Sequence, residues 1–214
     1  MQITHLGHAA VLVEVADRRI LIDPGNFSTA WHELTDLDAI IVTHQHPDHV
    51  DPEKVGAVIR NNPDAALYVE PQVLKAVDVG ERAQGLAADT SIDLGAVTVD
   101  AVGGLHAIIH RDIPQIGNVG LVLSAEGEPT LFHPGDSLAT VPQGIDVLAV
   151  PAYGPWAAMK ETIDFARAVK AAHGFPIHEG LLAERGVKLI YGRLEAMTDT
   201  AMHDLRGGKS WSPA

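Results

Sequence analysis

Three histidines and an aspartate follow directly on an apolar run, and this segment constrains the chain more than any other. From residue 40 to residue 49 the sequence reads Ile-Ile-Val-Thr-His-Gln-His-Pro-Asp-His. Side chains two residues apart in extended backbone point the same way, so His44 and His46 can reach one common ion. The proline ends the strand, and Asp48 and His49 then lie on a turn from which they can aim at a second point nearby. Because imidazole and carboxylate ligands suit zinc, iron and manganese, the segment predicts a metal site at the end of an apolar strand.

Composition restricts the chemistry further. The chain has twelve histidines in 214 residues and no cysteine, which excludes disulfides, thiolate metal ligands and a cysteine nucleophile. Its 28 acidic and 15 basic residues give a formal net charge of −13. A surface this acidic repels phosphate backbones and anionic lipids, so we expect a small-molecule substrate and neither nucleic acid nor a membrane as partner.

The opening residues lack a basic segment followed by an apolar core, which a secretory leader would have. The apolar runs are also well short of the roughly 20 residues that cross a bilayer. We therefore expect a cytoplasmic protein.

Short β-rich runs recur along the chain, with helical stretches between them. The expected strands are Gln2–Leu6, Ala10–Val15, Arg19–Ile22, Ala39–Val42, Ala66–Val69, Val97–Val102, Val119–Ser124, Thr130–Phe132, Val147–Val150 and Pro176–His178. The expected helices are Glu53–Asn61, Pro71–Val77, Glu161–Ala172 and Arg193–Leu205. With no linker or low-complexity tract in view, this alternation predicts one α/β-type domain over residues 1–214, with helices outside a mixed sheet system.

The His-x-His-x-Asp-His segment resembles the signature of the metallo-β-lactamase superfamily of metal-dependent hydrolases. The resemblance implies an α/β (α+β) fold, a four-layer αββα sandwich with the metals at one edge between the two sheets. It also implies further ligands downstream, for which His106, Asp136 and His178 are the matching positions, and an early aspartate at a strand end, matched by Asp23. The opening Thr-His-Leu-Gly-His-Ala of residues 4–9 looks most like the small branch that includes ascorbate-phosphate lactonase-like proteins.

Carried over position by position, the resemblance implies two divalent ions, with Zn²⁺ preferred over Mn²⁺ or Fe²⁺. His44, His46 and His106 would hold the first ion, Asp48, His49 and His178 the second, and Asp136 would bridge the two. Asp48 would also orient a hydroxide and move its proton, while Asp23 would hydrogen-bond a ligand or its loop. We expect this hydroxide to cleave a small ester, lactone, amide or phosphoester.

Other side chains near these positions have two readings each. His8 either lines the pocket or is an ordinary packed histidine, and His110, with Arg111, either reaches substrate or lies on a solvated loop. Tyr153, together with Trp31 and Trp156, either forms an aromatic wall for the substrate or anchors loops. Arg111 and Lys160 are the cations that an anionic substrate would use.

Three more histidines are expected outside the ligand set. His133 lies three residues before Asp136, where a structural or supporting role is expected rather than ligation. His173 and His203 are expected on helix surfaces.

Two rival functions remain open at this point. The same scaffold hosts thiol-oxidising dioxygenases with a single iron, and a non-catalytic sensor could retain its metals without turnover. The complete ligand set argues against a sensor, because degenerate members lose ligands. Fold alone does not fix the substrate.

Overall fold

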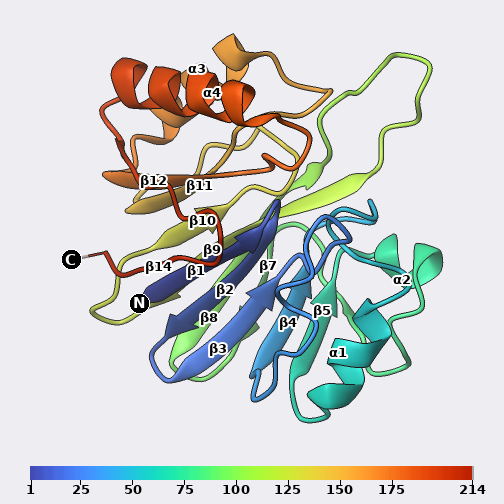
Figure 1. Cartoon of the computed structure of the whole chain (residues 1–214). Coiled ribbons are helices and arrows are strands. Elements are labelled where there is room, and N and C mark those ends of the chain that lie inside the picture. The colour runs from blue at the N-terminus through green and yellow to red at the C-terminus, as the bar shows by residue number, and fades with distance from the viewer. Residues whose placement is uncertain (214) are drawn as a thin grey trace.

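Two seven-stranded sheets stacked face to face form the middle of the molecule in the computed structural model, which describes residues 1–213 (Figure 1). The first sheet runs in the order β14 (Ser210–Trp211), β1 (Gln2–Gly7), β2 (Ala10–Val15), β3 (Arg18–Ile22), β4 (Ala39–Val42), β5 (Ala66–Val69) and β6 (Gln84–Gly85). The second runs in the order β13 (Ala201–Met202), β12 (His173–Ile177), β11 (Val147–Pro151), β10 (Leu131–His133), β9 (Gly117–Ala125), β8 (Val97–Leu105) and β7 (Thr90–Asp93).

Helices cover the outer face of each sheet. On the first sheet lie α1 (Val55–Asn61) and α2 (Val73–Ala76), and on the second lie α3 (Met159–Val169) and α4 (Glu184–Met197). Three apolar cores follow from these layers: one between the sheets, containing Ile41 and Leu121, and one under each helix pair. The predicted four-layer αββα sandwich is therefore confirmed, and the strand β4 is buried at all four residues, as a strand covered on both faces should be.

Parallel pairing brings the functional segments to one edge. Strand β4 pairs in parallel with β3 and β5, and β11 pairs in parallel with β10 and β12. The carboxyl ends of β3, β4, β10 and β12 precede Asp23, the His44–His49 segment, Asp136 and His178 respectively. Because parallel strands end at the same side of a sheet, Asp23 and the His44–His49 segment meet at one edge of the first sheet, and Asp136 and His178 meet at one edge of the second. The face-to-face stacking of the sheets brings these two edges together.

Side-chain hydrogen bonds shift two helix starts from the predicted positions. Helix α1 begins at Val55 rather than at Glu53, because the Asp51 carboxylate accepts the backbone N–H groups of Glu53 and Lys54 in a preceding turn. Helix α3 begins two residues before the predicted Glu161, whose carboxylate accepts the Ala158 N–H ahead of the helix. Both contacts satisfy N–H groups that have no partner inside a helix.

The predicted helix over Arg193–Leu205 is wrong in its second half. Helix α4 runs from Glu184 to Met197, and the chain then forms the short strand β13 beside β12. The Thr198 hydroxyl donates to the Leu194 carbonyl, and the run Thr198–Thr200, rich in β-branched residues, leaves the helix. The strands β6, β7, β13 and β14, none of which was predicted, are edge strands of two to four residues, too short to show an alternating pattern.

Two histidines expected on helix surfaces lie instead beside a sheet edge, so that prediction is also wrong. His173 begins β12, and His203 follows β13. The His203 ring stacks on Trp211 of β14 at 3.9 Å between ring centroids, and His203 Nε2 lies 3.3 Å from His173 Nδ1. The chain's last segment thus returns to β1 and joins the edges of both sheets (Figure 1).

Within residues 1–213, no helix has both the length and the apolar character that spanning a bilayer requires.

Candidate metal centre

Two clusters of histidine and aspartate side chains meet at the shared sheet edge. We call His44, His46, His106 and Asp136 the His44 cluster, and His8, Asp48, His49 and His178 the His178 cluster. In each cluster one potential ligand atom per residue lies within 4.8 Å of the others. The structure therefore brings together all seven side chains that the resemblance implied as ligands, and it adds His8.

Asp136 lies between the two clusters. Its Oδ1 is 3.1 Å from His49 Nε2, and its Oδ2 is 3.1 Å from His178 Nε2 and 3.3 Å from His106 Nε2. Trp156, for which the sequence left open an aromatic wall or loop anchoring, donates its indole N–H to Oδ2 at 2.9 Å. A carboxylate in this position can bridge two ions, one in each cluster.

Backbone carbonyls fix the rings of two of the histidines. His106 Nδ1–H donates to the Ala107 carbonyl at 2.7 Å, and His178 Nδ1–H donates to the Tyr153 carbonyl. In both rings the proton at Nδ1 leaves the Nε2 lone pair directed at the centre. Such bonds to the second ring nitrogen are how proteins orient metal-ligating histidines.

Hydrogen bonds involving Thr43 and Asp23 fix the rings of His44 and His49. Asp23 accepts the Thr43 N–H and hydroxyl, each at 2.7 Å, and also the Nδ1–H of His49 at 2.6 Å. Since the only hydroxyl proton of Thr43 goes to Asp23, its oxygen accepts from His44 Nδ1–H at 3.1 Å. The Nε2 atoms of His44 and His49 are thereby left for the centre. Asp23 takes the supporting place that the resemblance implied for it.

Burial and charge set the ionisation of this group. Burial lowers the pKa of His44 well below its ordinary value, so the ring is neutral and able to bind a cation without losing a proton. Burial also opposes protonation of His49, but the carboxylates of Asp136 and Asp23 outweigh it and raise that pKa. Burial would raise the pKa of Asp136, and the neighbouring His49 and His178 instead lower it well below its ordinary value.

The donor set fits metal ions because several of its atoms have no other partner. The Nε2 atoms of His49, His106 and His178, and Oδ1 of Asp136, are buried without a hydrogen bond of proper geometry. His44 Nε2 lies 3.1 Å from His46 Nδ1, a spacing at which two ring nitrogens can share one ion. Unpaired buried polar atoms are rare in folded proteins because each is expensive to desolvate. A pair of divalent ions would satisfy all of them.

His8 holds Asp48 rather than offering a free ligand atom. The backbone N–H of Gly180 donates to His8 Nδ1 at 3.1 Å, so the ring proton is on Nε2 and is donated to Asp48 Oδ2 at 2.9 Å. Burial alone would raise the pKa of Asp48, but this hydrogen bond and the nearby His49 lower it. Glu179 accepts the His8 backbone N–H at 3.1 Å and thereby supports the arrangement.

Three residues of the centre have left-handed backbone. The φ angles of His8, Asp23 and His178 are +54°, +49° and +62°. Non-glycine residues seldom adopt this region, and such strained positions concentrate at functional sites. The turn carrying Asp48 is also held close: a Cβ on Gly25 would lie 1.8 Å from the Asp48 carbonyl oxygen. Only glycine permits this approach.

The loop before Asp136 is fixed by buried polar side chains. Asn118 accepts the Asp136 N–H at 2.9 Å and donates to the Pro134 carbonyl at 3.0 Å. His133 donates Nε2–H to the Ala9 carbonyl, and its Nδ1 accepts the Gly135 N–H. His133 therefore has the structural role that the sequence predicts.

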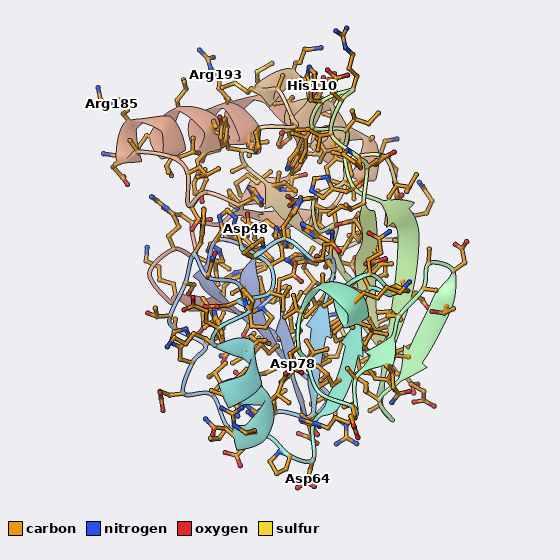
Figure 2. The ribbon with its side chains drawn as sticks, turned by 90° about the vertical axis from the view of Figure 1, so that its right-hand side faces the viewer. Asp48, Asp64, Asp78, His110, Arg185 and Arg193 are labelled. Carbon is orange, nitrogen blue, oxygen red and sulfur yellow. The ribbon has the colours of Figure 1, made fainter. Side chains whose placement is uncertain are left out.

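The proposed substrate contacts lie at different distances from the centre. Asp48 is partly buried, with its side chain one-fifth exposed, whereas His110 lies at the outer edge of the molecule in Figure 2, on the exposed loop between β8 and β9. His110 Nδ1 accepts the Asp112 N–H within the same loop. The role of His110 in substrate binding stays a prediction. Tyr153 contributes its backbone carbonyl to His178, and its partly exposed side chain stays a candidate for the substrate.

Trp31 does not belong to an aromatic wall. Its side chain is fully buried beneath the first sheet's helices, and its indole N–H donates to the Gly25 carbonyl. Trp31 therefore anchors the loop that follows Asp23. The sequence left this outcome open, because a tryptophan after a strand can point either way.

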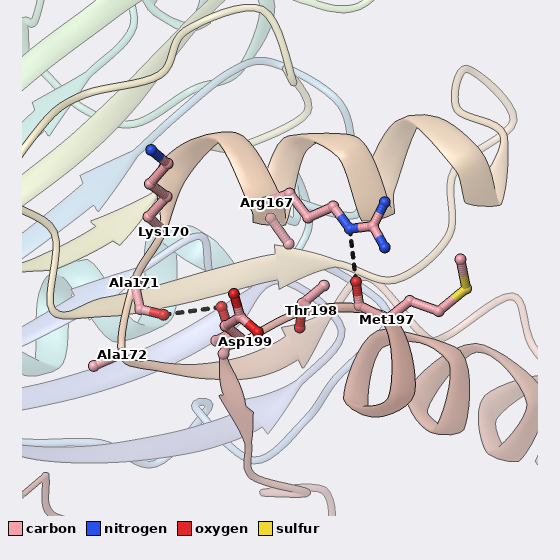
Figure 3. Close-up of a pocket in the computed structure, with 9 residues that line it drawn as sticks. Arg167, Lys170, Ala171, Ala172, Met197, Thr198 and Asp199 are labelled. Carbon is pink, nitrogen blue, oxygen red and sulfur yellow. Dashed lines mark hydrogen bonds between the residues drawn. The ribbon is translucent and has the colours of Figure 1, made fainter.

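Two hollows near the second sheet differ in their relation to the centre. The first, about 400 Å³, lies where α3 meets the end of α4 (Figure 3); Arg167 Nε there donates to the Met197 carbonyl at 2.7 Å, and the Thr200 hydroxyl donates to the Ala171 carbonyl. None of the described residues lining it is a histidine. The second, about 690 Å³, is lined by His106 and Trp156 and so opens onto the centre.

Comparison with known proteins agrees with this geometry. A family model described as a beta-lactamase superfamily domain matches residues 2–178. The Mycobacterium tuberculosis protein Rv0786c is 42% identical over 201 residues, 94% of each chain. A metal-dependent hydrolase from Xanthobacter autotrophicus is 33% identical over 153 residues, which are 64% of this chain and 62% of that protein.

Among solved structures, the metallo-beta-lactamase fold protein YhfI from Bacillus subtilis superposes with a TM-score of 0.74 at 15% identity, over 99% of both chains. At this identity the likeness concerns the fold. The family model, in contrast, covers most of the sequence, including every residue of both clusters. The chain therefore belongs to the β-lactamase superfamily, and its relatives there include proteins named as metal-dependent hydrolases.

Proposed function

We propose that the protein is a hydrolase that uses two divalent ions, with zinc as the preferred metal, to cleave a small ester, lactone, amide or phosphoester with water. The observation that carries the proposal is the convergence of unpartnered buried Nε2 atoms on Asp136, with one histidine–aspartate cluster on either side. A structural site for one ion would need four ligands and no bridge. Two adjoining clusters that share a carboxylate are what two-metal hydrolysis requires.

Ions held by these residues would lower the pKa of a shared water toward 7 and polarise the carbonyl or phosphoryl oxygen under attack. The chain's own residues then have distinct tasks. His44, His46 and His106 would supply imidazole nitrogens to one side, and His49 and His178 would supply them to the other. His49 would first give up the proton that the Asp136 and Asp23 carboxylates favour. Asp136 balances positive charge between the two sides, and Trp156 orients its Oδ2.

Asp48 has the task nearest to the reacting water. Its carboxylate is one-fifth exposed, so it can reach a water molecule as well as the His178 cluster. The hydrogen bond from His8 keeps Asp48 ionised and directs Oδ2, which lies 3.5 Å from His178 Nε2. We assign to Asp48 the orientation of the attacking water and the acceptance of its proton on the way to the leaving group.

Turnover by Asp48→Ala tests this assignment. Zinc-loaded wild type, Asp48→Ala and the exposed control Asp112→Ala are assayed on p-nitrophenyl acetate, a γ-lactone, p-nitroacetanilide and bis(p-nitrophenyl) phosphate. We expect wild type and Asp112→Ala to hydrolyse at least one of them, and Asp48→Ala to lose about 100-fold or more in kcat. Full turnover by Asp48→Ala with both ions bound would remove Asp48 from the mechanism. Failure of the loaded wild type on all four substrate classes would overturn the hydrolase proposal.

A further inference from the structure

The 690 Å³ pocket shares two residues with the metal centre. His106 belongs to the His44 cluster, and Trp156 donates to Asp136. From there the pocket extends between the start of the β8–β9 loop, residues 137–141 and one face of α3. Its volume is that of a site for a small organic molecule. A substrate whose reacting atom lies at the clusters would therefore extend into this space.

The pocket walls are mostly apolar. Phe165 is buried at the α3 side, and Leu138 and Val141 belong to the apolar layer packed around it. Leu105 and Ile108, on the opposite wall, are 60% and 66% exposed. Exposed large aliphatic side chains beside a pocket gain free energy when an apolar group covers them.

The charges in this pocket are negative. Glu161 and Asp164 of α3 line it, and none of its lining residues, all within the described chain, is lysine or arginine. Of the cations that the sequence suggested for an anionic substrate, Arg111 is exposed beside Asp112, and Lys160 pairs with the pocket residue Glu161 at 3.6 Å, so Lys160 offsets the charge of Glu161 but not that of Asp164. An anionic group beside α3 in the pocket would therefore be repelled by the Asp164 carboxylate.

We propose that this pocket binds an uncharged, apolar acyl group, and that the substrates are carboxylic esters, lactones or amides rather than phosphoesters. This inference rests on the hydrolase function proposed above and narrows it. In the reaction, water oxygen forms a bond to the carbonyl carbon, the bond from that carbon to the alkoxy or amino group breaks, and the leaving group takes a proton from water. Ile108, Phe165 and Ala168 then select the length of the acyl chain.

Acyl-chain selectivity tests the apolar part of the proposal. Ala168 is exposed on α3 and lines the pocket, so Ala168→Trp fills space there without disturbing the core. Ala196→Trp, on an exposed position of α4 outside the pocket, is the matched control. For wild type we expect kcat/KM to be higher on p-nitrophenyl hexanoate than on the acetate, and Ala168→Trp to lower the hexanoate-to-acetate ratio by about tenfold. An unchanged ratio in Ala168→Trp would overturn the proposal, as would an equal effect of Ala196→Trp.

The dependence of activity on substrate charge tests the proposed effect of the acidic residues in the pocket. Asp164→Lys should raise kcat/KM on the anionic p-nitrophenyl hemisuccinate about fivefold, while the control Glu195→Lys on α4 leaves it unchanged. Preference of the wild type for bis(p-nitrophenyl) phosphate over both neutral esters would contradict the inference. It would leave the hydrolase function standing.

Binding of a neutral ketone supplies a readout that does not depend on turnover. Methyl hexyl ketone carries the same kind of chain as the hexanoyl ester but cannot be hydrolysed. Calorimetry should detect its binding to wild type, with Kd about tenfold weaker in Ala168→Trp and unchanged in Ala196→Trp. If no ester is hydrolysed but the ketone binds in this pattern, the proposed function fails and the acyl pocket stands. If esters are hydrolysed but the ketone binds wild type and Ala168→Trp alike, the acyl pocket fails alone.

Discussion

At the scale of single residues, the candidate metal centre depends on groups that hold its side chains in place by hydrogen bonds. Thr43 and Asp23 fix His44 and His49, two backbone carbonyls fix His106 and His178, and His8 fixes Asp48. Each contact removes a rotational alternative from a ligand before any ion binds. Preorganisation of this kind strengthens binding because less conformational entropy is lost at that step.

Removal of the His8 side chain is expected to weaken the His178 cluster selectively. His8→Ala takes away the hydrogen bond to Asp48, so affinity for one of the two zinc ions should fall by about 10- to 100-fold, with the other unchanged. Competition with a zinc chelator at equilibrium measures both affinities. His8→Gln keeps an N–H donor and should restore most of the loss. If both variants lose the ion equally, His8 is a ligand and not a positioning residue.

Asp23→Asn is expected to destabilise the fold. The carboxylate is fully buried and accepts three hydrogen bonds, from Thr43 N–H, Thr43 hydroxyl and His49. An amide directs N–H at one of these donors, so the free energy of unfolding should fall by about 2–3 kcal/mol. Urea unfolding of the metal-free protein measures this, with the exposed Asp112→Asn as control. Equal midpoints for Asp23→Asn and wild type would show that the carboxylate is dispensable.

Residue type and spacing predicted a metal site at residues 44–49, and the resemblance implied the downstream ligands and the supporting Asp23. Neither indicated the roles of Thr43 and Trp156. Histidine and aspartate residues at strand ends can be recognised in the sequence itself, as in residues 44–49. No sequence signal indicates the role of Trp156, because its indole contacts Asp136 from a loop twenty residues further along the chain. The role of Thr43 could not be predicted for a different reason: a threonine after an apolar strand gives the same sequence pattern whether or not it bridges two side chains.

At the scale of elements, the centre depends on how closely loops approach one another. The segment after β3 runs against the turn that carries Asp48, and Trp31 anchors it by donating to the Gly25 carbonyl. The sequence predicted β3 and β4 nearly to the residue, because both are apolar runs that end in polar side chains. It failed where the signal was short, as at β13, where two residues pair with β12. Pairing of so few residues is decided by tertiary contacts and not by local preference.

Two glycine variants distinguish a glycine that close packing requires from a glycine that only adds backbone freedom. Gly25→Ala would place Cβ 1.8 Å from the Asp48 carbonyl oxygen, so it should destabilise the protein by about 1–3 kcal/mol and weaken zinc binding. Gly192, inside α4, has no neighbour within 4 Å of such a Cβ. Gly192→Ala should therefore stabilise the protein by about 0.5–1 kcal/mol and leave zinc binding unchanged. Thermal unfolding with and without zinc compares the two. Normal zinc affinity in Gly25→Ala would show that the Asp48 turn tolerates displacement.

At the scale of the whole molecule, the two sheets divide the ligands between them. His44, His46, Asp48 and His49 follow β4 of the first sheet, and His106, Asp136 and His178 follow strands of the second. Each cluster contains residues from both sheets, so each is complete only when the two sheets are packed together. The four-layer arrangement was implied by the resemblance, whereas the alternation of strands and helices predicted only an α/β-type domain with helices outside a mixed sheet system. The acyl pocket could not be predicted, because its walls come from three distant segments that only folding brings together.

The metal content of wild type and Asp136→Ala tests the central claim most directly. Tag-free protein is loaded with zinc, freed of excess by gel filtration and analysed by elemental mass spectrometry, with Asp112→Ala as control. A centre bridged by Asp136 predicts two ions per chain in wild type and in Asp112→Ala, and fewer than two in Asp136→Ala. Two ions retained by Asp136→Ala, or no stoichiometric zinc in wild type, would contradict the dinuclear centre.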